Sequence, residues 1–237
     1  MGACGQHGPS RQTQYAEEIA NKIDSLSIPS TEILPGEMSL YNESEETTHY
    51  SIVDKFGNAV STTTTINSSY GSGVVVEGAG FLLNNEMDDF SSKPGEPNQF
   101  GLIGSEANKI EPNKRMLSSM SPTIVLKDDK PFMVVGSPGG STISTVVLQV
   151  ILNVLNFGMD IQQAIDMPRI HHQWLPDILY YERFGLSLDV IQALKNKRHI
   201  FGEKRTLGRC EGIVVDVENQ IFFGATDPRG YGAAVGF

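Results

Sequence analysis

The chain has 237 residues, enough for one sizeable hydrophobic core, and its 28 acidic residues outnumber its 18 lysines and arginines. The formal net charge of -10 argues against a nucleic-acid partner, because binding to phosphates requires a basic surface. Cys4 and Cys210 are too few for a disulfide framework or a thiolate metal site. No apolar run reaches the roughly 18 residues that predict a transmembrane helix.

The first 46 residues predict little regular structure beyond one helix. Residues 15–23 have an amphipathic pattern that predicts a helix with Ala16, Ile19, Ala20 and Ile23 on one face. The polar, proline-containing stretch 25–46 has no clear period, which predicts an exposed linker.

The next part of the chain predicts strands. The segments THYSIV and NAVSTTTTI flank DKFG at 54–57, which predicts two strands joined by a tight turn. A third strand is predicted for GVVVEGAGFLLNN at 73–85. The segment 122–136, PTIVLKDDKPFMVVG, predicts a second hairpin with its turn at 128–130.

Helices dominate the following stretch, and strands close the chain. An apolar helix is predicted after Gly140, ending near Phe157, and Asp160 with Gln163 resembles a capping box for a second helix. A third short helix is predicted at 187–194. The segments 212–217 and 220–226 predict two final strands, so the whole pattern indicates a layered α/β protein.

Thr47 is a candidate nucleophile of an unusual kind. A threonine that is the first residue of a chain can use its own α-amino group as the base, since that amine has a pKa of about 7.7–8.0. Cleavage of the Glu46–Thr47 bond, where the predicted linker meets the first strand, would create such a residue. From the residues alone, ordinary strand threonines at Thr47 and Thr65 remain the alternative.

Other motifs are also ambiguous without further information. Gly139 and Gly140 place backbone amides at a predicted helix start, where they suit an oxyanion or simply tight packing. His171 and His172 are adjacent in a predicted extended segment, so they should point to opposite faces rather than share a metal. Asp227 and Arg229, in the segment TDPRG, should form either a structural ion pair with each other or a turn.

One long segment, TTHYSIVDKFGNAVSTTTTINSSYG, closely resembles the signature of the γ-glutamyltransferases, which are N-terminal nucleophile hydrolases. The blocks LLNNEMDDFSSKPGEPNQFG, PNKRMLSSMSPTIV, GSPGGS, PRIHHQWLPD and GATDPRG follow in the family's order. The resemblance implies an αββα sandwich that is incomplete without a large subunit. Residues 1–14 are then an unmatched tail, 15–46 the end of the large-subunit region, and 47–237 the small-subunit catalytic domain.

The resemblance also implies roles for residues around the reacting bond. Thr47 matches the nucleophile that autocleavage exposes, and Thr65 matches a residue that hydrogen-bonds and orients it. Gly139 and Gly140 match the oxyanion hole.

Five further positions match residues that hold the γ-glutamyl substrate. Asn67, Glu86 and Asp89 match the groups around its α-amino group, and carboxylate and amide oxygens suit the three donors of an ammonium. Ser118 and Ser119 match donors to its α-carboxylate. The loop around Phe100 matches a lid over the glutamyl site, with phenylalanine where some relatives have tyrosine. No metal or organic cofactor is implied.

The activity implied is hydrolysis or transfer of γ-glutamyl groups from glutathione and related amides, through an ester on Thr47. Water or an amino-acid or peptide amine would accept the group, and the large subunit would be the protein partner. Alternatives are a related poly-γ-glutamate or cephalosporin-type acylase, or a non-catalytic fragment. A periplasmic or extracellular location is expected if the N-terminal portion that is missing here carries an export signal.

Overall fold

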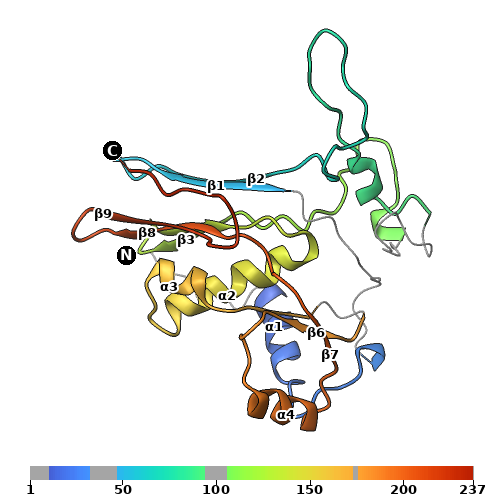
Figure 1. The fold of residues 1–237 in the computed structure, drawn as a ribbon, viewed down its shortest axis with the longest axis vertical. Coiled ribbons are helices and arrows are strands. Elements are labelled where there is room, and N and C mark those ends of the chain that lie inside the picture. The colour runs from blue at the N-terminus through green and yellow to red at the C-terminus, as the bar shows by residue number, and fades with distance from the viewer. Residues whose placement is uncertain (1–10, 33–46, 94–105, 173–175, 237) are drawn as a thin grey trace, which may run out of the picture.

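A computed structural model describes residues 11–32, 47–93, 106–172 and 176–236, and these residues form stacked layers (Figure 1). A two-stranded sheet lies over a four-stranded sheet, and two helices, α2 and α3, cover the other face of the larger sheet. The predicted layered α/β class is confirmed. None of the helices in these ranges is both long and apolar enough to cross a membrane.

The two-stranded sheet is the hairpin predicted at the start of the catalytic region. β1 (Thr48–Val53) pairs antiparallel with β2 (Ala59–Thr64). The connecting turn closes with a hydrogen bond of 3.0 Å from the Gly57 amide to the Asp54 carbonyl. Gly57 has φ +84, a conformation that glycine adopts without steric cost. The sequence DKFG therefore sets the register of this hairpin.

The four-stranded sheet is antiparallel throughout, in the order β3-β4-β8-β9. Its strands are β3 (Thr123–Lys127), β4 (Lys130–Gly136), β8 (Glu211–Asp216) and β9 (Ile221–Thr226). The predicted β3–β4 turn is confirmed, and both Asp128 and Asp129 have positive φ there. Two consecutive left-handed residues are the geometry of the tight turns that match strand twist.

The main core lies between this sheet and the helices α2 (Ile143–Leu155) and α3 (Ile161–Asp166). Buried positions in α2 recur at helical spacing, which gives the helix one apolar face. They are Ile143, Val146, Val147 and Val150. The predicted capping box of α3 is present, with the Gln163 amide donating to Asp160 Oδ1 at 2.8 Å.

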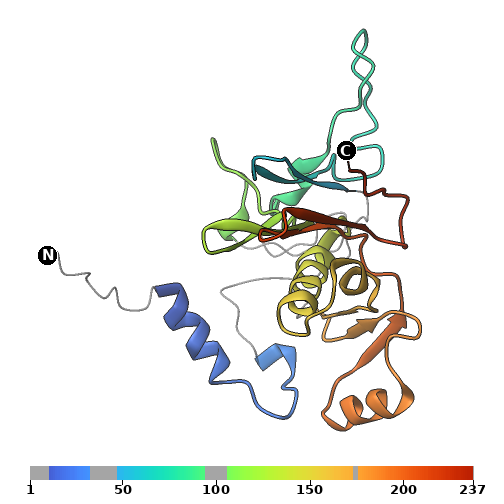
Figure 2. The ribbon, with the colours of Figure 1, turned by 90° about the vertical axis from the view of Figure 1, so that its left-hand side faces the viewer.

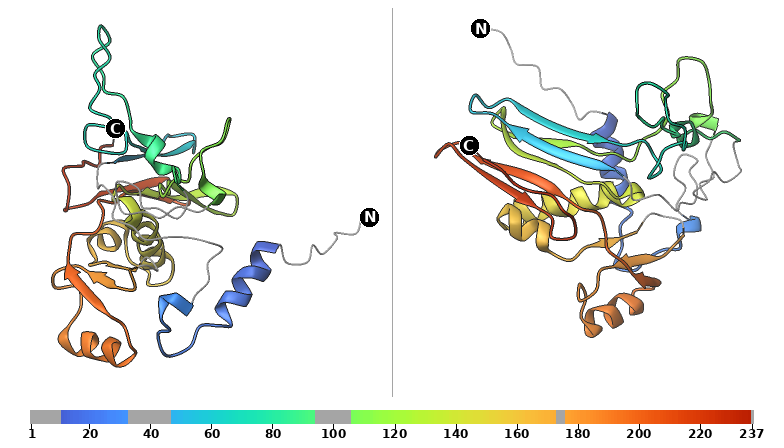
Figure 3. Two further views of the ribbon diagram at one scale, coloured as in Figure 1. Left: turned by 90° about the vertical axis from the view of Figure 1, so that its right-hand side faces the viewer. Right: turned by 45° about the horizontal axis from the view of Figure 1, so that its top comes forward.

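A third sheet, β5-β6-β7, was not predicted. It consists of β5 (Ile170–His171), β6 (Leu179–Tyr181) and β7 (Phe201–Lys204), and with α4 (Leu188–Asn196) it lies below the core (Figure 3). Strands of two to four residues are too short to show an alternating pattern, so the sequence carries little signal for them.

The N-terminal helix differs from the prediction in its limits. α1 spans Arg11–Ala20 rather than residues 15–23, and it extends away from the layers (Figures 2 and 3). Ile19 is 43% exposed and Ile23 is 77% exposed, so the predicted apolar face is not buried against the described residues.

Part of the predicted exposed linker is in fact buried. Ser30, in a short 3₁₀ turn (Ser30–Glu32), is only 1% exposed. Its amide donates to Asp177 Oδ2 at 2.8 Å, and the Ser27 amide donates to the Lys197 carbonyl at 2.9 Å. Composition could not predict this, because the partners lie about 150 residues away in the sequence. Residues 33–46 lie outside the described ranges.

The strand predicted at 73–85 is wrong. The segment folds back on itself into an arm that projects from the body (Figure 2), with one bridge between Val75 and Leu82. Its tip contains Gly78 and Gly80, both with positive φ. These glycines reverse the chain within the apolar run, and such reversals interrupt a strand.

The outer face of the β1–β2 sheet is uncovered by any helix within the described residues (Figure 1). Tyr50, Ile52 and Val60 are 46%, 52% and 46% exposed. The described residues thus form three of the four layers of an αββα sandwich.

A buried ion-pair network joins the helical layer to the end of the chain. Arg169 Nη2 lies 2.6 Å from Asp227 Oδ2, and Arg229 bonds both Asp227 (3.0 Å) and Glu182 (2.6 Å). Burial acts to raise the pKa of Asp227. The Arg169 charge and the amides of Arg229 and Cys210 outweigh burial, so this pKa is lowered. The structural ion pair and turn predicted for TDPRG are both confirmed.

Replacing Asp227 with asparagine should destabilise the fold by about 3–5 kcal/mol, because it leaves Arg169 buried without its counter-charge. Urea unfolding followed by circular dichroism measures the effect. Asp129→Asn, in an exposed turn, is the matched control and should change stability little. Equal stability of the two variants would show that the network contributes nothing.

Candidate active site

Thr47 lies directly before β1 and is half-buried. The last pair of the hairpin register is Thr48 with Thr64. Thr47 and Thr65 are the residues immediately next to this pair, so the predicted nucleophile and its predicted partner lie at the same end of the hairpin.

Hydrogen bonds link Thr65 to the predicted amino-group site. The Asn67 amide donates to Thr65 Oγ1 at 2.9 Å, and Asn67 has φ +72. Its Nδ2 donates to the Asn85 carbonyl at 3.4 Å, while the Asn85 amide donates to the Ile66 carbonyl at 3.3 Å. This pairing joins the end of β2 to the acidic segment that follows Asn85.

That acidic segment is the 3₁₀ turn Glu86–Asp89. Burial, reinforced by the charges of Glu86 and Asp88, raises the pKa of Asp89 to about 6. Burial also raises the pKa of Glu86. Raised carboxyl pKa values show that the negative charges lack sufficient compensation here. A bound cation, such as an ammonium group, would supply it.

Asn108, which the sequence analysis did not select, bridges two parts of the site. Its Nδ2 donates to the Asp89 carbonyl at 2.7 Å, and its Oδ1 accepts from the Leu117 amide at 2.9 Å. Leu117 immediately precedes Ser118, so the acidic segment and the predicted carboxylate site share one bridging side chain. An asparagine in EANK has no sequence signal for this role.

The two predicted serines lie on the segment that leads into β3. Ser118 is exposed, and its Oγ accepts from the Met120 amide at 3.2 Å. Ser121 Oγ donates to the Ser119 carbonyl at 3.0 Å and lies 3.2 Å from the Oγ of Ser144, in the first turn of α2. The serine pair is thereby tied to the helix that begins just after the glycine pair.

Gly139 and Gly140 are both buried at the start of a short 3₁₀ turn (Gly140–Thr142) that leads into α2. Their φ values are +135 and +55. A Cβ at Gly139 would lie 2.6 Å from Thr142 Oγ1 and 3.1 Å from the Gly208 Cα. Glycine is therefore required here for conformation and for space, and amides that open a helix are suited to bind an anion.

If Gly139 serves the reaction, Gly139→Ala should reduce γ-glutamyl turnover by up to about 10²–10³-fold. The new methyl group would collide with Thr142 and Gly208 and displace the backbone amide from the oxyanion. Gly78→Ala is the control, because Gly78 also has positive φ (+79) but open space around it. Initial rates on a γ-glutamyl anilide, with circular dichroism to verify folding, make the comparison. Equal rates for the two variants would contradict a role for Gly139 in the reaction.

The histidine pair forms no metal site. His171 is buried and His172 exposed, as expected for neighbours in an extended segment. His172 Nε2 lies 3.0 Å from Asp177 Oδ1, and no cluster of three or more metal ligands occurs among the described residues. Phe100 and Cys4 lie outside those residues.

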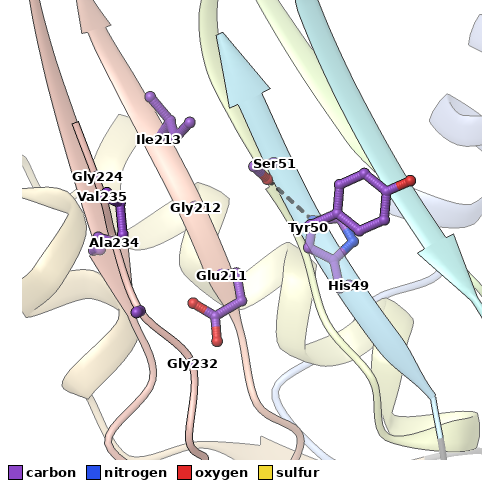
Figure 4. A pocket seen from close by; sticks show the side chains of 12 residues that line it. His49, Tyr50, Ser51, Glu211, Gly212, Ile213, Gly224, Gly232, Ala234 and Val235 are labelled. Carbon is purple, nitrogen blue, oxygen red and sulfur yellow. Dashed lines mark hydrogen bonds between the residues drawn. The ribbon is translucent and has the colours of Figure 1, made fainter. Parts of the chain in front are cut away.

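His49 is the other residue that the sequence analysis missed. It borders a cavity of about 280 Å³ between β1 and the β8–β9 strands (Figure 4). The cavity is also lined by Tyr50, Ser51, Glu211 and the C-terminal segment 232–235. None of the predicted site residues lines this cavity, so the proposed glutamyl site lies elsewhere.

Comparison with known proteins decides the family. Residues 10–237 match the family model described as gamma-glutamyltranspeptidase. The chain belongs to the γ-glutamyltranspeptidase family. It is 50% identical over 216 residues to the glutathione hydrolase proenzyme of Escherichia coli K12. That match covers 91% of this chain but 37% of the relative, so the chain spans well under half the relative's length.

Solved structures support the same fold. The γ-glutamyltranspeptidase T380A mutant of Helicobacter pylori is 57% identical with a TM-score of 0.74, over 77% of this chain and 100% of the compared one. The cephalosporin acylase of Bacillus halodurans has the same TM-score at 26% identity, over 92% of this chain and 37% of that protein. The fold of this γ-glutamyltranspeptidase family member is thus that of the N-terminal nucleophile hydrolases.

Proposed function

We propose that this chain carries the catalytic centre of a γ-glutamyl hydrolase and transferase that acts on glutathione and related γ-glutamyl amides. One observation carries the proposal: hydrogen bonds, together with short backbone stretches, connect most of the segments that contain the predicted site residues. Hydrogen bonds connect Thr65 with Asn67, Asn67 with Asn85 beside the acidic turn, and Asn108 with both Asp89 and Leu117. Ser121 bonds Ser119 and Ser144 of α2, and short backbone stretches join these groups of bonds. Segments far apart in the sequence are thereby brought together.

The proposed maturation step is hydrolysis of the Glu46–Thr47 peptide bond. Water supplies the hydroxyl of the new Glu46 carboxyl group and a proton for the new α-amine of Thr47. The names of relatives support this step, since several are called proenzymes. Residues 1–46 then belong to the large-subunit side and 47–237 to the small-subunit side.

In the proposed reaction, the Thr47 α-amine takes the proton from Oγ as Oγ attacks the γ-carbonyl carbon. The Gly139 and Gly140 amides stabilise the oxyanion. The C–N bond then breaks, the leaving amine takes the proton from the Thr47 ammonium, and a γ-glutamyl ester remains. Water or an acceptor amine attacks the ester, which releases glutamate or a new γ-glutamyl amide and restores the Thr47 hydroxyl.

Recognition of the substrate's glutamyl end is assigned to charge and hydrogen bonding. The uncompensated carboxylates Glu86 and Asp89, with the Asn67 amide oxygen, hold the α-ammonium group. Ser118 and Ser119 hydroxyls donate to the α-carboxylate. An ammonium group would offset the repulsion between the two carboxylates, which favours substrates that have a free α-amine.

Mass spectrometry of the purified chain tests the proposal. Fragments 1–46 and 47–237 should appear, and the cleaved protein should hydrolyse a γ-glutamyl anilide. The assay is run with and without a separately expressed large-subunit portion from a relative. If a chain that stays uncleaved hydrolyses the anilide as fast as the cleaved protein does, Thr47 is not the nucleophile.

The similarity to the cephalosporin acylase supports a second candidate, an acylase for glutaryl groups. A glutaryl group lacks the α-amine, so Asp89→Ala discriminates between the two. If the γ-glutamyl proposal is right, this change lowers γ-glutamyl turnover far more than glutaryl turnover. Equal losses on both substrates would favour the acylase.

A further inference from the structure

His49 is buried, with 6% of its surface exposed, on the strand that begins directly after Thr47. Thr47 is the residue immediately before β1, so it lies two residues from His49 along the chain. The Nδ1 atom of His49 lies 2.8 Å from Thr63 Oγ1. Its Nε2 lies 3.1 Å from Ser51 Oγ, as Figure 4 shows. Because hydroxyls can donate or accept, a neutral ring is satisfied in either tautomer.

Burial lowers the pKa of His49 to about 4, so the imidazole is neutral at physiological pH. Both ring nitrogens are held by hydroxyls of its own hairpin. A ring held in this way is poorly placed to take the proton of Thr47 Oγ, and its contribution must be sought in where it packs.

The ring packs directly on Gly136, the last residue of β4. A Cβ at Gly136 would overlap the His49 ring atoms Cε1, Nδ1 and Nε2. A second contact supports the same approach of the sheets, since Ser61 Oγ donates to the Val135 carbonyl at 3.2 Å. The start of β1 and the end of β4 are thus held at a separation that the imidazole sets.

The His49–Gly136 contact lies close in sequence to two segments with proposed catalytic roles. Thr47 is two residues before His49, and Gly139 is three residues after Gly136. We infer that His49 is a positioning residue that fixes the distance between the Thr47 hydroxyl and the amides of Gly139 and Gly140. The inference rests on the proposed function, and His49 acts through β1 without touching the substrate.

The test uses the full chain with His49→Ala, Gly136→Ala and the double variant, together with His49→Asn. Both cleavage after Glu46 and kcat should fall by about 10–10²-fold in His49→Ala, because small misplacements of reacting groups are costly. KM should stay within about twofold, since the glutamyl contacts lie on other segments. Lys55→Ala, in the exposed turn between β1 and β2, is the control and should act as wild type.

Two further variants separate positioning from general damage. Gly136→Ala should be harmful with His49 present, but much less so after His49→Ala, which vacates the space that the new methyl group needs. Such non-additivity reports direct coupling of the two residues. His49→Asn should recover part of kcat, because its amide can bond Thr63. Urea unfolding verifies that each variant is folded. If His49→Ala does not fold, the comparison rests on His49→Asn and the double variant.

Unchanged kcat and cleavage in His49→Ala would overturn the inference, as would additive losses in the double variant. A rise in KM at constant kcat would overturn it too. In each of these cases an active, cleaved wild-type chain leaves the proposed function intact. A wild-type chain that neither cleaves nor turns over γ-glutamyl anilide, alone or with a large-subunit portion, overturns the proposed function and this inference together.

Discussion

Thr47→Ala is expected to yield a single uncleaved chain and to lower γ-glutamyl turnover by at least about 10³-fold. The change removes the attacking hydroxyl and, if the cut is autocatalytic, it also prevents release of the α-amine that serves as base. Mass spectrometry reports the cleavage, and initial rates on a γ-glutamyl anilide report the turnover.

The neighbouring threonine provides a matched control for this experiment. Thr48 is exposed and begins β1, so Thr48→Ala should cleave and turn over substrate much as wild type does. Thr47→Ser, which keeps a hydroxyl and would gain the same α-amine, should retain part of both activities. Normal cleavage in Thr47→Ala, or equal losses in the two alanine variants, would remove Thr47 from the mechanism.

The second large effect is expected from pH. Asp89 has a pKa raised to about 6 by burial and by the nearby charges of Glu86 and Asp88. The α-ammonium of the substrate needs the ionised carboxylate, and below its pKa the ionised fraction falls about tenfold per pH unit. KM for the γ-glutamyl anilide should therefore rise as the pH falls below about 6.

Asp89→Asn should raise KM at neutral pH and flatten its dependence between pH 5 and 7. Glu77→Gln, on the exposed arm, is the control and should keep the wild-type profile. Protonation of the Thr47 amine affects kcat over this range, so steady-state fits that separate kcat from KM are required. A wild-type KM that stays constant from pH 7 to 5 would exclude Asp89 as the ammonium ligand.

The free energy of unfolding should also depend on the protonation of Asp89. Through this group, low pH should favour the folded state, whereas it weakens substrate binding. Since the pKa of Asp89 is higher in the folded chain than in the unfolded one, the folded state binds more protons between about pH 4 and 6. Its share of the free energy of unfolding is therefore largest below this window and decreases as the pH rises through it. Urea unfolding at pH 4.5 and 7 of wild type and Asp89→Asn isolates this contribution.

Local chemistry made much of the fold predictable. The DKFG turn, the Asp128–Asp129 turn and the capping box at Asp160 each depend on side chains a few residues apart, and all three are confirmed. The projecting arm at 73–85 was predicted incorrectly because its β-branched residues favour a strand, whereas Gly78 and Gly80 reverse the chain. The strands of the third sheet have only two to four residues, too few to show an alternating pattern.

In the candidate site, too, the features that depend on nearby residues were predictable and those that depend on tertiary packing were not. Thr47 and Thr65 lie next to the terminal pair, Thr48 and Thr64, of a hairpin that the sequence predicts, and the glycine pair precedes a predicted helix. Asn108 and His49 could not be found in this way. Their roles depend on contacts with Asp89 and Gly136, which are made only when separate segments pack together.

The buried Ser30 has a consequence for what a cut after Glu46 would leave behind. The backbone amides of Ser27 and Ser30 donate hydrogen bonds to the Lys197 carbonyl and the Asp177 carboxylate. Lys197 and Asp177 belong to the longer product of the cut. After such a cut, these hydrogen bonds would still connect the shorter product to the longer one, so the burial of Ser30 favours their association.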